Sequence, residues 1–170
     1  MNLQDFDILF ERLKIGKHQF DFELNDVFFE LMENPIIQKG NINVDLILEK
    51  KERMMIVDFE FSGFATVECD RCTDPLNIDV DFEEQIIYKF DEGESEDEHL
   101  IYIAQSEFKI NVAAVCNELV SVNMPLRSVH EDEEECNPDV LDFIDGVATD
   151  DENEDIDPRW EALKKLDKND

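Results

Sequence analysis

The sequence has few basic residues, few glycines and no long apolar run, and each shortage excludes a class of protein. Of 170 residues, 15 are Lys or Arg and 45 are Asp or Glu, so the formal net charge is -30. Charge of that sign repels phosphate backbones, which proteins usually bind through Lys and Arg, and it attracts basic partners. The five glycines are not clustered, so no glycine-rich loop is available to cradle a phosphate.

Neither a membrane segment nor an enzyme active site can be identified. No apolar run reaches the roughly 18 residues of a membrane span, and the N-terminus lacks the basic and apolar regions of a secretion signal. We therefore expect a cytoplasmic protein, whose four cysteines are thiols or metal ligands rather than disulfides. No Ser-His-Asp or Cys-His nucleophile arrangement can be argued, which favours a binding protein over an enzyme.

Apolar and polar residues alternate through much of the first half of the chain. The alternating segments are 20–24, 42–48, 55–61 and 76–90. A period of two is typical of strands with one buried and one solvated face, which suits an antiparallel sheet. The charged run 50–53 is then the tip of a hairpin, and Asn25 or Asp26 is expected to cap a short helix.

A second helix is predicted after Asn111, which can serve as its N-cap. Its apolar positions follow the i, i+3, i+4, i+7, i+8 spacing of a helix packed on a core: Val112, Val115, Cys116, Leu119 and Val120. Cys116 is therefore expected to be a small buried hydrophobic residue. The patterns together predict an α+β fold, a mainly antiparallel β-sheet with one or two packed helices and an acidic, partly disordered C-terminal extension.

Two segments carry much of the acidity. Residues 91–98 hold six acidic and no basic residues and are expected to form a solvated loop, whereas residues 131–157 hold 14 acidic residues and no Lys or Arg. The longer segment is expected to be extended and largely disordered. We therefore predict a β-rich globular domain over 1–130, an acidic linker over 131–157 and a short amphipathic helix over 158–168.

The expected C-terminal helix has recognisable start signals and a narrow apolar ridge. Asp157 is a good N-cap and Pro158 suits the first helical position. The ridge consists of Trp160, Leu163 and Leu166. Because a helix this short is not stable alone in water, we expect this ridge to dock on the domain or on a partner.

The sharpest local motif is the Cys-x-x-Cys pair formed by Cys69 and Cys72. Two thiolates at this spacing can hold one tetrahedral metal ion from a tight turn. His130 and Cys136 could complete a Cys3His set, for which zinc is the first choice because it accepts mixed sulfur and nitrogen ligands. The alternative is a pair of reduced thiols that closes a turn.

A redox role for the same motif is less favoured. Reactive cysteine pairs lower their thiol pKa with nearby positive charge or a helix N-terminus. Here Glu68, Asp70 and Asp74 flank the pair, and Arg71 alone opposes them. The local field therefore favours the thiol over the reactive thiolate.

Direct RNA contact requires a local basic surface. The candidates are Lys50, Lys51 and Arg53 at the expected hairpin tip, with Arg12, Lys14 and Lys17 as a second group. Phosphate contacts are normally made by such residues. Ordinary solvated charge remains the alternative for both groups.

Several segments, in this order, resemble the YceD family of bacterial proteins associated with accumulation of large-subunit ribosomal RNA. The segments are Leu13-Lys14-x-Gly16 followed by Phe20 and Phe22, Cys69-x-Arg71-Cys72, Met124-Pro125-Leu126-Arg127-Ser128-Val129-His130 with Cys136, and Asp157-Pro158-Arg159 with its trailing Leu/Lys helix. They span nearly the whole chain. His130 stands where a cysteine is often found in the family.

The resemblance implies a non-catalytic role in ribosome biogenesis at the large subunit. We expect a basic ribosomal protein or large-subunit assembly factor as partner, and ribosomal RNA as a further contact. Two alternatives stay open: a metal-stabilised interaction module outside ribosome assembly, and a thiol-disulfide oxidoreductase built on the cysteine pair.

Overall fold

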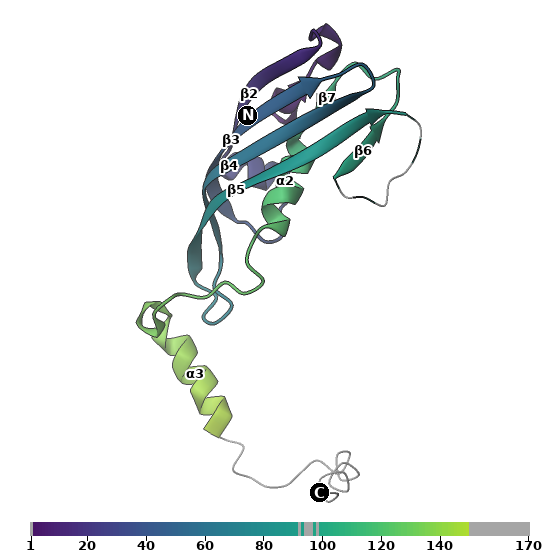
Figure 1. Ribbon diagram of the computed structural model, residues 1–170. Helices are drawn as coiled ribbons and strands as arrows, with labels where there is room; N and C mark the ends of the chain where they lie inside the picture. Colours follow the sequence, from purple (N-terminus) through teal and green to yellow (C-terminus); the bar gives the residue numbers. More distant parts are fainter. Residues whose placement is uncertain (1, 92, 94–96, 98, 150–170) are drawn as a thin grey trace, which may run out of the picture. The chain divides into compact units, whose positions relative to one another are not determined.

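The computed structural model describes residues 2–91, 93, 97 and 99–149, and Figure 1 shows the order of its elements. The chain forms two compact units, Met1–Val129 and His130–Asp170. No helix among the described residues is both long and apolar enough to cross a membrane.

The first unit is built mainly of strands. Its elements are η1 (Leu3–Phe6), β1 (Asp7–Ile8), η2 (Phe10–Arg12), β2 (Gly16–Leu24), α1 (Asp26–Leu31), β3 (Lys39–Lys50), β4 (Met54–Glu68), β5 (Pro75–Phe90), β6 (Leu100–Ile103), β7 (Ile110–Asn111) and α2 (Ala113–Val122). The four long strands coincide with the alternating segments of the sequence. The predicted α+β fold with a mainly antiparallel sheet is confirmed.

Five strands form the main sheet in the order β2-β3-β4-β5-β6. The first four strands are joined in antiparallel pairs. Strand β6 pairs in parallel with the last residues of β5, from Ile87 to Phe90. Sequence analysis did not predict β6, because its run of four apolar residues, all half-buried, shows no alternation.

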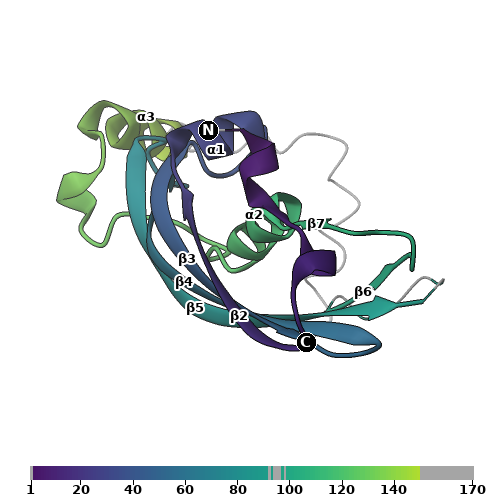
Figure 2. The same ribbon diagram turned by 90° about the horizontal axis from the view of Figure 1, so that it is seen from above.

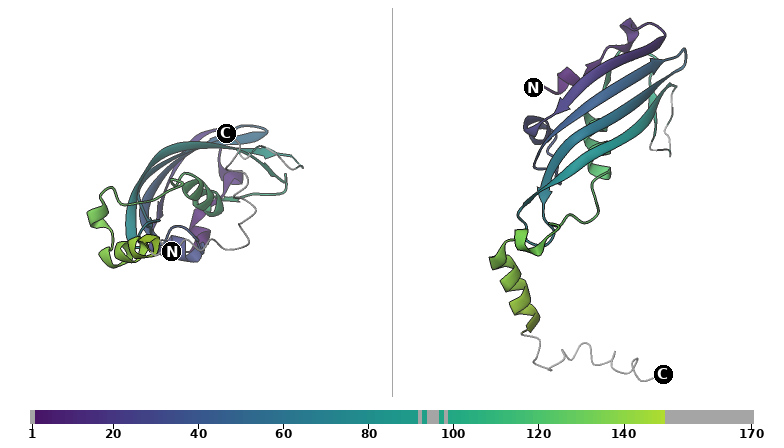
Figure 3. Two further views of the ribbon diagram at one scale, coloured as in Figure 1. Left: turned by 90° about the horizontal axis from the view of Figure 1, so that it is seen from below. Right: turned by 60° about the vertical axis from the view of Figure 1, so that its left-hand side comes forward.

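The sheet is strongly curved, and its helices lie on the concave side. Figure 2 shows the strands bending around α2, and the left view of Figure 3 shows the N-terminal 3-10 turns on that same side. Inward side chains of β3 and β4 such as Leu46 and Phe61 are fully buried there. Burial of such side chains away from water is the main source of stability for this layer.

Both predicted helices of this unit are found, but only one predicted cap is correct, because Val112 rather than Asn111 occupies the N-cap position of α2. Asn25 caps α1, with its side-chain oxygen accepting a hydrogen bond from the Phe28 amide. Asn111 Oδ1 accepts from the Ala113 amide at the start of α2. The predicted apolar stripe of α2 is also confirmed, since Val112, Cys116 and Val120 are fully buried.

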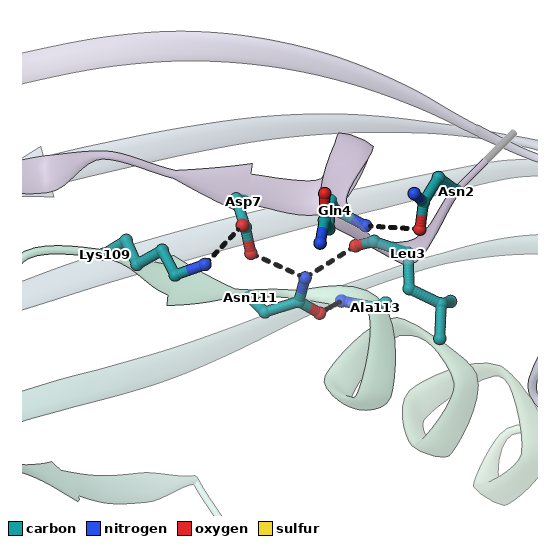
Figure 4. A network of polar contacts seen from close by, with 7 residues as sticks. All are labelled: Asn2, Leu3, Gln4, Asp7, Lys109, Asn111 and Ala113. Atoms are coloured by element: carbon teal, nitrogen blue, oxygen red, sulfur yellow. Dashed lines mark hydrogen bonds and ion pairs between the residues drawn. The ribbon is translucent and has the colours of Figure 1, made fainter.

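A polar network fastens the N-terminus to the start of α2 (Figure 4). Strand β1 pairs with β7, and Asp7 accepts hydrogen bonds from Lys109 Nζ at 2.7 Å and Asn111 Nδ2 at 2.8 Å. The same Nδ2 donates to the Leu3 carbonyl at 2.7 Å. The hydrogen bonds from Lys109 and then Asn111 lower the pKa of Asp7, because they stabilise the carboxylate form.

The second unit contains η3 (Glu133–Glu135) and α3 (Pro138–Thr149). The helix α3 is a correction, because residues 131–157 were expected to be extended. Asn137 Oδ1 accepts from the Asp139 amide at 3.1 Å, and proline is well suited to a helix start. Apolar Val140, Leu141 and Ile144 then recur at helical spacing, a signal that the acidic composition obscured.

Candidate metal centre

The Cys-x-x-Cys pair lies in the turn that joins β4 to β5. The Cys69 amide donates to the Asp74 carbonyl at 2.9 Å, and the Thr73 amide donates to the Cys69 carbonyl at 2.8 Å. Thr73 adopts a left-handed backbone conformation with φ of 63°. These bonds close the turn, so the two cysteines are presented from one short, fixed segment.

Asp70 ties this turn to the chain that leads to His130. Its amide donates to the Ser128 carbonyl at 2.7 Å, and its Oδ2 accepts from the Ser128 amide at 2.6 Å. The reciprocal pair fixes two segments that are 58 residues apart in the sequence. The sequence alone did not predict this role, because it shows Asp70 only as an acidic neighbour of the cysteines.

His130 and Cys136 are brought together by the short turn η3. The Cys136 amide donates to the Glu133 carbonyl at 3.0 Å and the Glu135 amide to the Asp132 carbonyl at 3.2 Å, which turns the chain back on itself. Cys136 Sγ then lies 3.6 Å from His130 Nδ1. The five-residue gap between the two predicted ligands is therefore short enough to bring both side chains to one point.

The four predicted ligand residues form one buried cluster. The ligand atoms of Cys69, Cys72, His130 and Cys136 all lie within 4.8 Å of one another. The exposed fractions of the cysteines are 1%, 0% and 3%, and that of His130 is 9%. The set predicted from residue type and spacing is thus assembled as a Cys3His group that could hold a metal ion.

The donor set and its spacing fit zinc. Tetrahedral zinc with bonds of about 2.3 Å to sulfur and 2.0 Å to nitrogen places sulfur and nitrogen ligands about 3.5 Å apart. Cys136 Sγ and His130 Nδ1 are 3.6 Å apart, close to that separation. A set with four protein ligands is typical of structural zinc sites, whereas catalytic sites keep one position for water or substrate.

The fourth cysteine lies apart from this cluster, on α2. Burial raises the pKa of the Cys116 thiol to about 12, because a thiolate in the apolar core would lose its hydration. Cys116 therefore behaves as the buried hydrophobic residue that its position in the helix stripe predicted. Its thiol offers a control for experiments on the other three.

The expected basic tip is only partly available for contacts. Lys50 Nζ donates to the carbonyl oxygens of Phe10 at 2.7 Å and Leu13 at 2.9 Å. Lys51 Nζ lies 3.4 Å from Glu49 Oε2, while Arg53 is exposed. Trp160, Leu163 and Leu166, expected to bind a partner, lie outside the described residues.

Comparison with known proteins gives a family match. The model of the family described as large ribosomal RNA subunit accumulation protein YceD matches residues 57–167. No curated protein and no solved structure matches the chain. The matched region includes all four residues of the Cys3His cluster and covers more than half of the sequence. The chain therefore belongs to the YceD family.

Proposed function

We propose that this protein is a non-catalytic ribosome-biogenesis factor that supports accumulation of large-subunit ribosomal RNA. The observation that carries the proposal is the family match over residues 57–167. The residues themselves favour binding over catalysis, because the Cys3His group would leave a bound metal without an open position for substrate.

In this proposal Cys69, Cys72, His130 and Cys136 hold a structural zinc ion. The ion would supply cross-linking rather than reaction chemistry, joining the β4–β5 turn to the segment around η3. The burial of all four side chains supports this role, since reactive cysteines need solvent access. The acidic neighbours of the turn also disfavour thiol-disulfide exchange, because their negative charge opposes formation of a reactive free thiolate.

We further propose that the acidic segments meet a basic ribosomal protein or assembly factor. Opposite charge speeds encounter and excludes like-charged competitors. The ridge of Trp160, Leu163 and Leu166 is the proposed apolar anchor of that contact. Ribosomal RNA is a second proposed contact, through Arg53 and Lys51 rather than Lys50, whose ammonium already serves two carbonyl groups.

The test is to fractionate a cell extract on a density gradient and detect the protein in each fraction. We expect it to travel with precursors of the large ribosomal subunit and to leave them at high salt, because salt screens exposed charge pairs. A protein that remains with free proteins at the top of the gradient, even at low salt, would instead support an interaction module outside ribosome assembly.

A further inference from the structure

The convex side of the sheet is uncovered within Met1–Val129. Figure 2 and the left view of Figure 3 show that α1, α2 and the N-terminal turns all lie on the opposite, concave side. A sheet usually buries one face and exposes the other to water. The exposed face is therefore an available surface, and the side chains that alternate outward from β2 to β5 determine what it can bind.

A row of four carboxylates crosses this exposed face, one from each of the strands β2, β3, β4 and β5. The pairing register places Asp21 opposite Asp45, Asp45 opposite Glu60 and Glu60 opposite Glu83. All four residues are exposed, and we call them the acidic row. Like charges directly opposite each other destabilise a sheet, so the row is not explained by the stability of the fold.

Nothing in the described part of the chain neutralises the acidic row. None of its four carboxylates forms an ion pair there. The pKa of Asp45 is raised, first by its hydrogen bond with the Asp21 carboxyl group and then by a loss of hydration and by the Asp21 charge. The raised pKa reflects crowding of negative charge, which a basic ligand would relieve.

The row is accompanied by apolar surface in a hollow of the sheet. The hollow is lined by Gln19, Asp45, Ile47, Asp58, Glu60 and Glu83 together with neighbouring residues. Ile47 is 40% exposed and lies on β3, two residues from Asp45 of the row. Lysine and arginine carry an apolar stem below a charged head, so the stem can cover Ile47 while the head meets a carboxylate.

We propose that this face docks a lysine- and arginine-rich segment of a protein partner along the acidic row. The inference deepens the proposed function, on which it rests for the partner being basic, and it adds the folded domain to the acidic segments as a surface that binds this partner. An RNA partner is disfavoured because its phosphates would meet four carboxylates. A single metal ion is disfavoured because the acidic row is not among the ligand groups that converge in the described residues.

The test compares two variants of the full chain with equal changes in charge. The first neutralises the row with Asp45→Asn, Glu60→Gln and Glu83→Gln. The matched control neutralises the C-terminal extension with Asp151→Asn, Glu152→Gln and Glu154→Gln. The probe is a labelled synthetic peptide of alternating lysine and serine, with binding measured by fluorescence anisotropy at low and moderate salt.

We expect the row variant to bind the peptide about tenfold more weakly, or worse, because several charge pairs are lost together. The extension variant should keep its affinity within about twofold. The row variant should also melt at a higher temperature than the unaltered protein, because the like-charge repulsion is removed, which excludes unfolding as the cause of lost binding.

Two results would overturn the proposal. If both variants bind the peptide equally weakly, binding depends on the net charge of the protein alone and not on the acidic row. Weakening in the extension variant alone would place recognition in the extension, which refutes the acidic row as the docking surface but leaves the proposed function intact.

Discussion

Purified protein is expected to contain one zinc ion per chain, and Cys72→Ser should abolish it. The serine oxygen is a poor replacement for a thiolate in a tetrahedral sulfur-rich site. A ligand present at a thousand times its dissociation constant stabilises a protein by about 4 kcal/mol. If the variant loses this stabilisation because zinc no longer binds, the melting temperature of a chain of this size falls by about 10 °C.

The measurements are elemental analysis and thermal unfolding followed by circular dichroism. Cys116→Ala is the matched control, because Cys116 is equally buried but lies in α2, outside the ligand cluster. It should lose stability through the cavity it leaves while retaining a full zinc content. Wild-type protein that contains no zinc after purification without chelators, or a Cys72→Ser variant that retains it, would contradict the metal site.

The second large effect is expected at Gly63, where β4 passes close to β3. Gly63 has a φ of 150°, and an added Cβ would lie 2.1 Å from the Asn41 carbonyl oxygen and 2.9 Å from Ile42 Cα. Both neighbours are backbone atoms that a rotamer change cannot move. The Gly63→Ala substitution should therefore destabilise the protein by about 3 kcal/mol or more, from backbone strain and overpacking combined.

Gly146→Ala is the control for this substitution. Gly146 lies in α3, and an added Cβ there meets nothing within 4 Å. Alanine in a helix is favoured over glycine by up to about 1 kcal/mol, so this variant should be neutral or slightly more stable. Urea unfolding of the two variants should separate them widely, and a Gly63→Ala variant as stable as the parent would refute the close approach of the two strands.

Local patterns in the sequence predicted most of the fold. Period-two alternation identified the four long strands, the capping residue Asn25 identified the start of α1, and Asn111 located the start of α2 to within one residue, since Val112 is its N-cap. The short strands were not predictable, because β1 and β7 have only two residues each and their pairing depends on contacts distant in sequence. The helix α3 was missed because acidic composition was weighted above the Asn137-Pro138 start signal.

The residues of the candidate metal centre could be predicted from the sequence, whereas those of the acidic row could not. The Cys3His group was identifiable because cysteine and histidine are rare in this chain and their chemistry is specific. Carboxylates are abundant, so no pattern distinguished Asp45 or Glu60 from any other acid. Only the register of the sheet aligns them, and a slip of one residue would send each side chain to the opposite face.

The most direct test of the account is the ratio of large- to small-subunit ribosomal RNA in cells that lack the protein. We expect this ratio to fall, to recover when the wild-type chain is supplied, and to remain low with the Cys72→Ser variant, in which the Cys3His group is incomplete. A ratio that does not change when the protein is removed would contradict the proposed role in large-subunit ribosomal RNA accumulation.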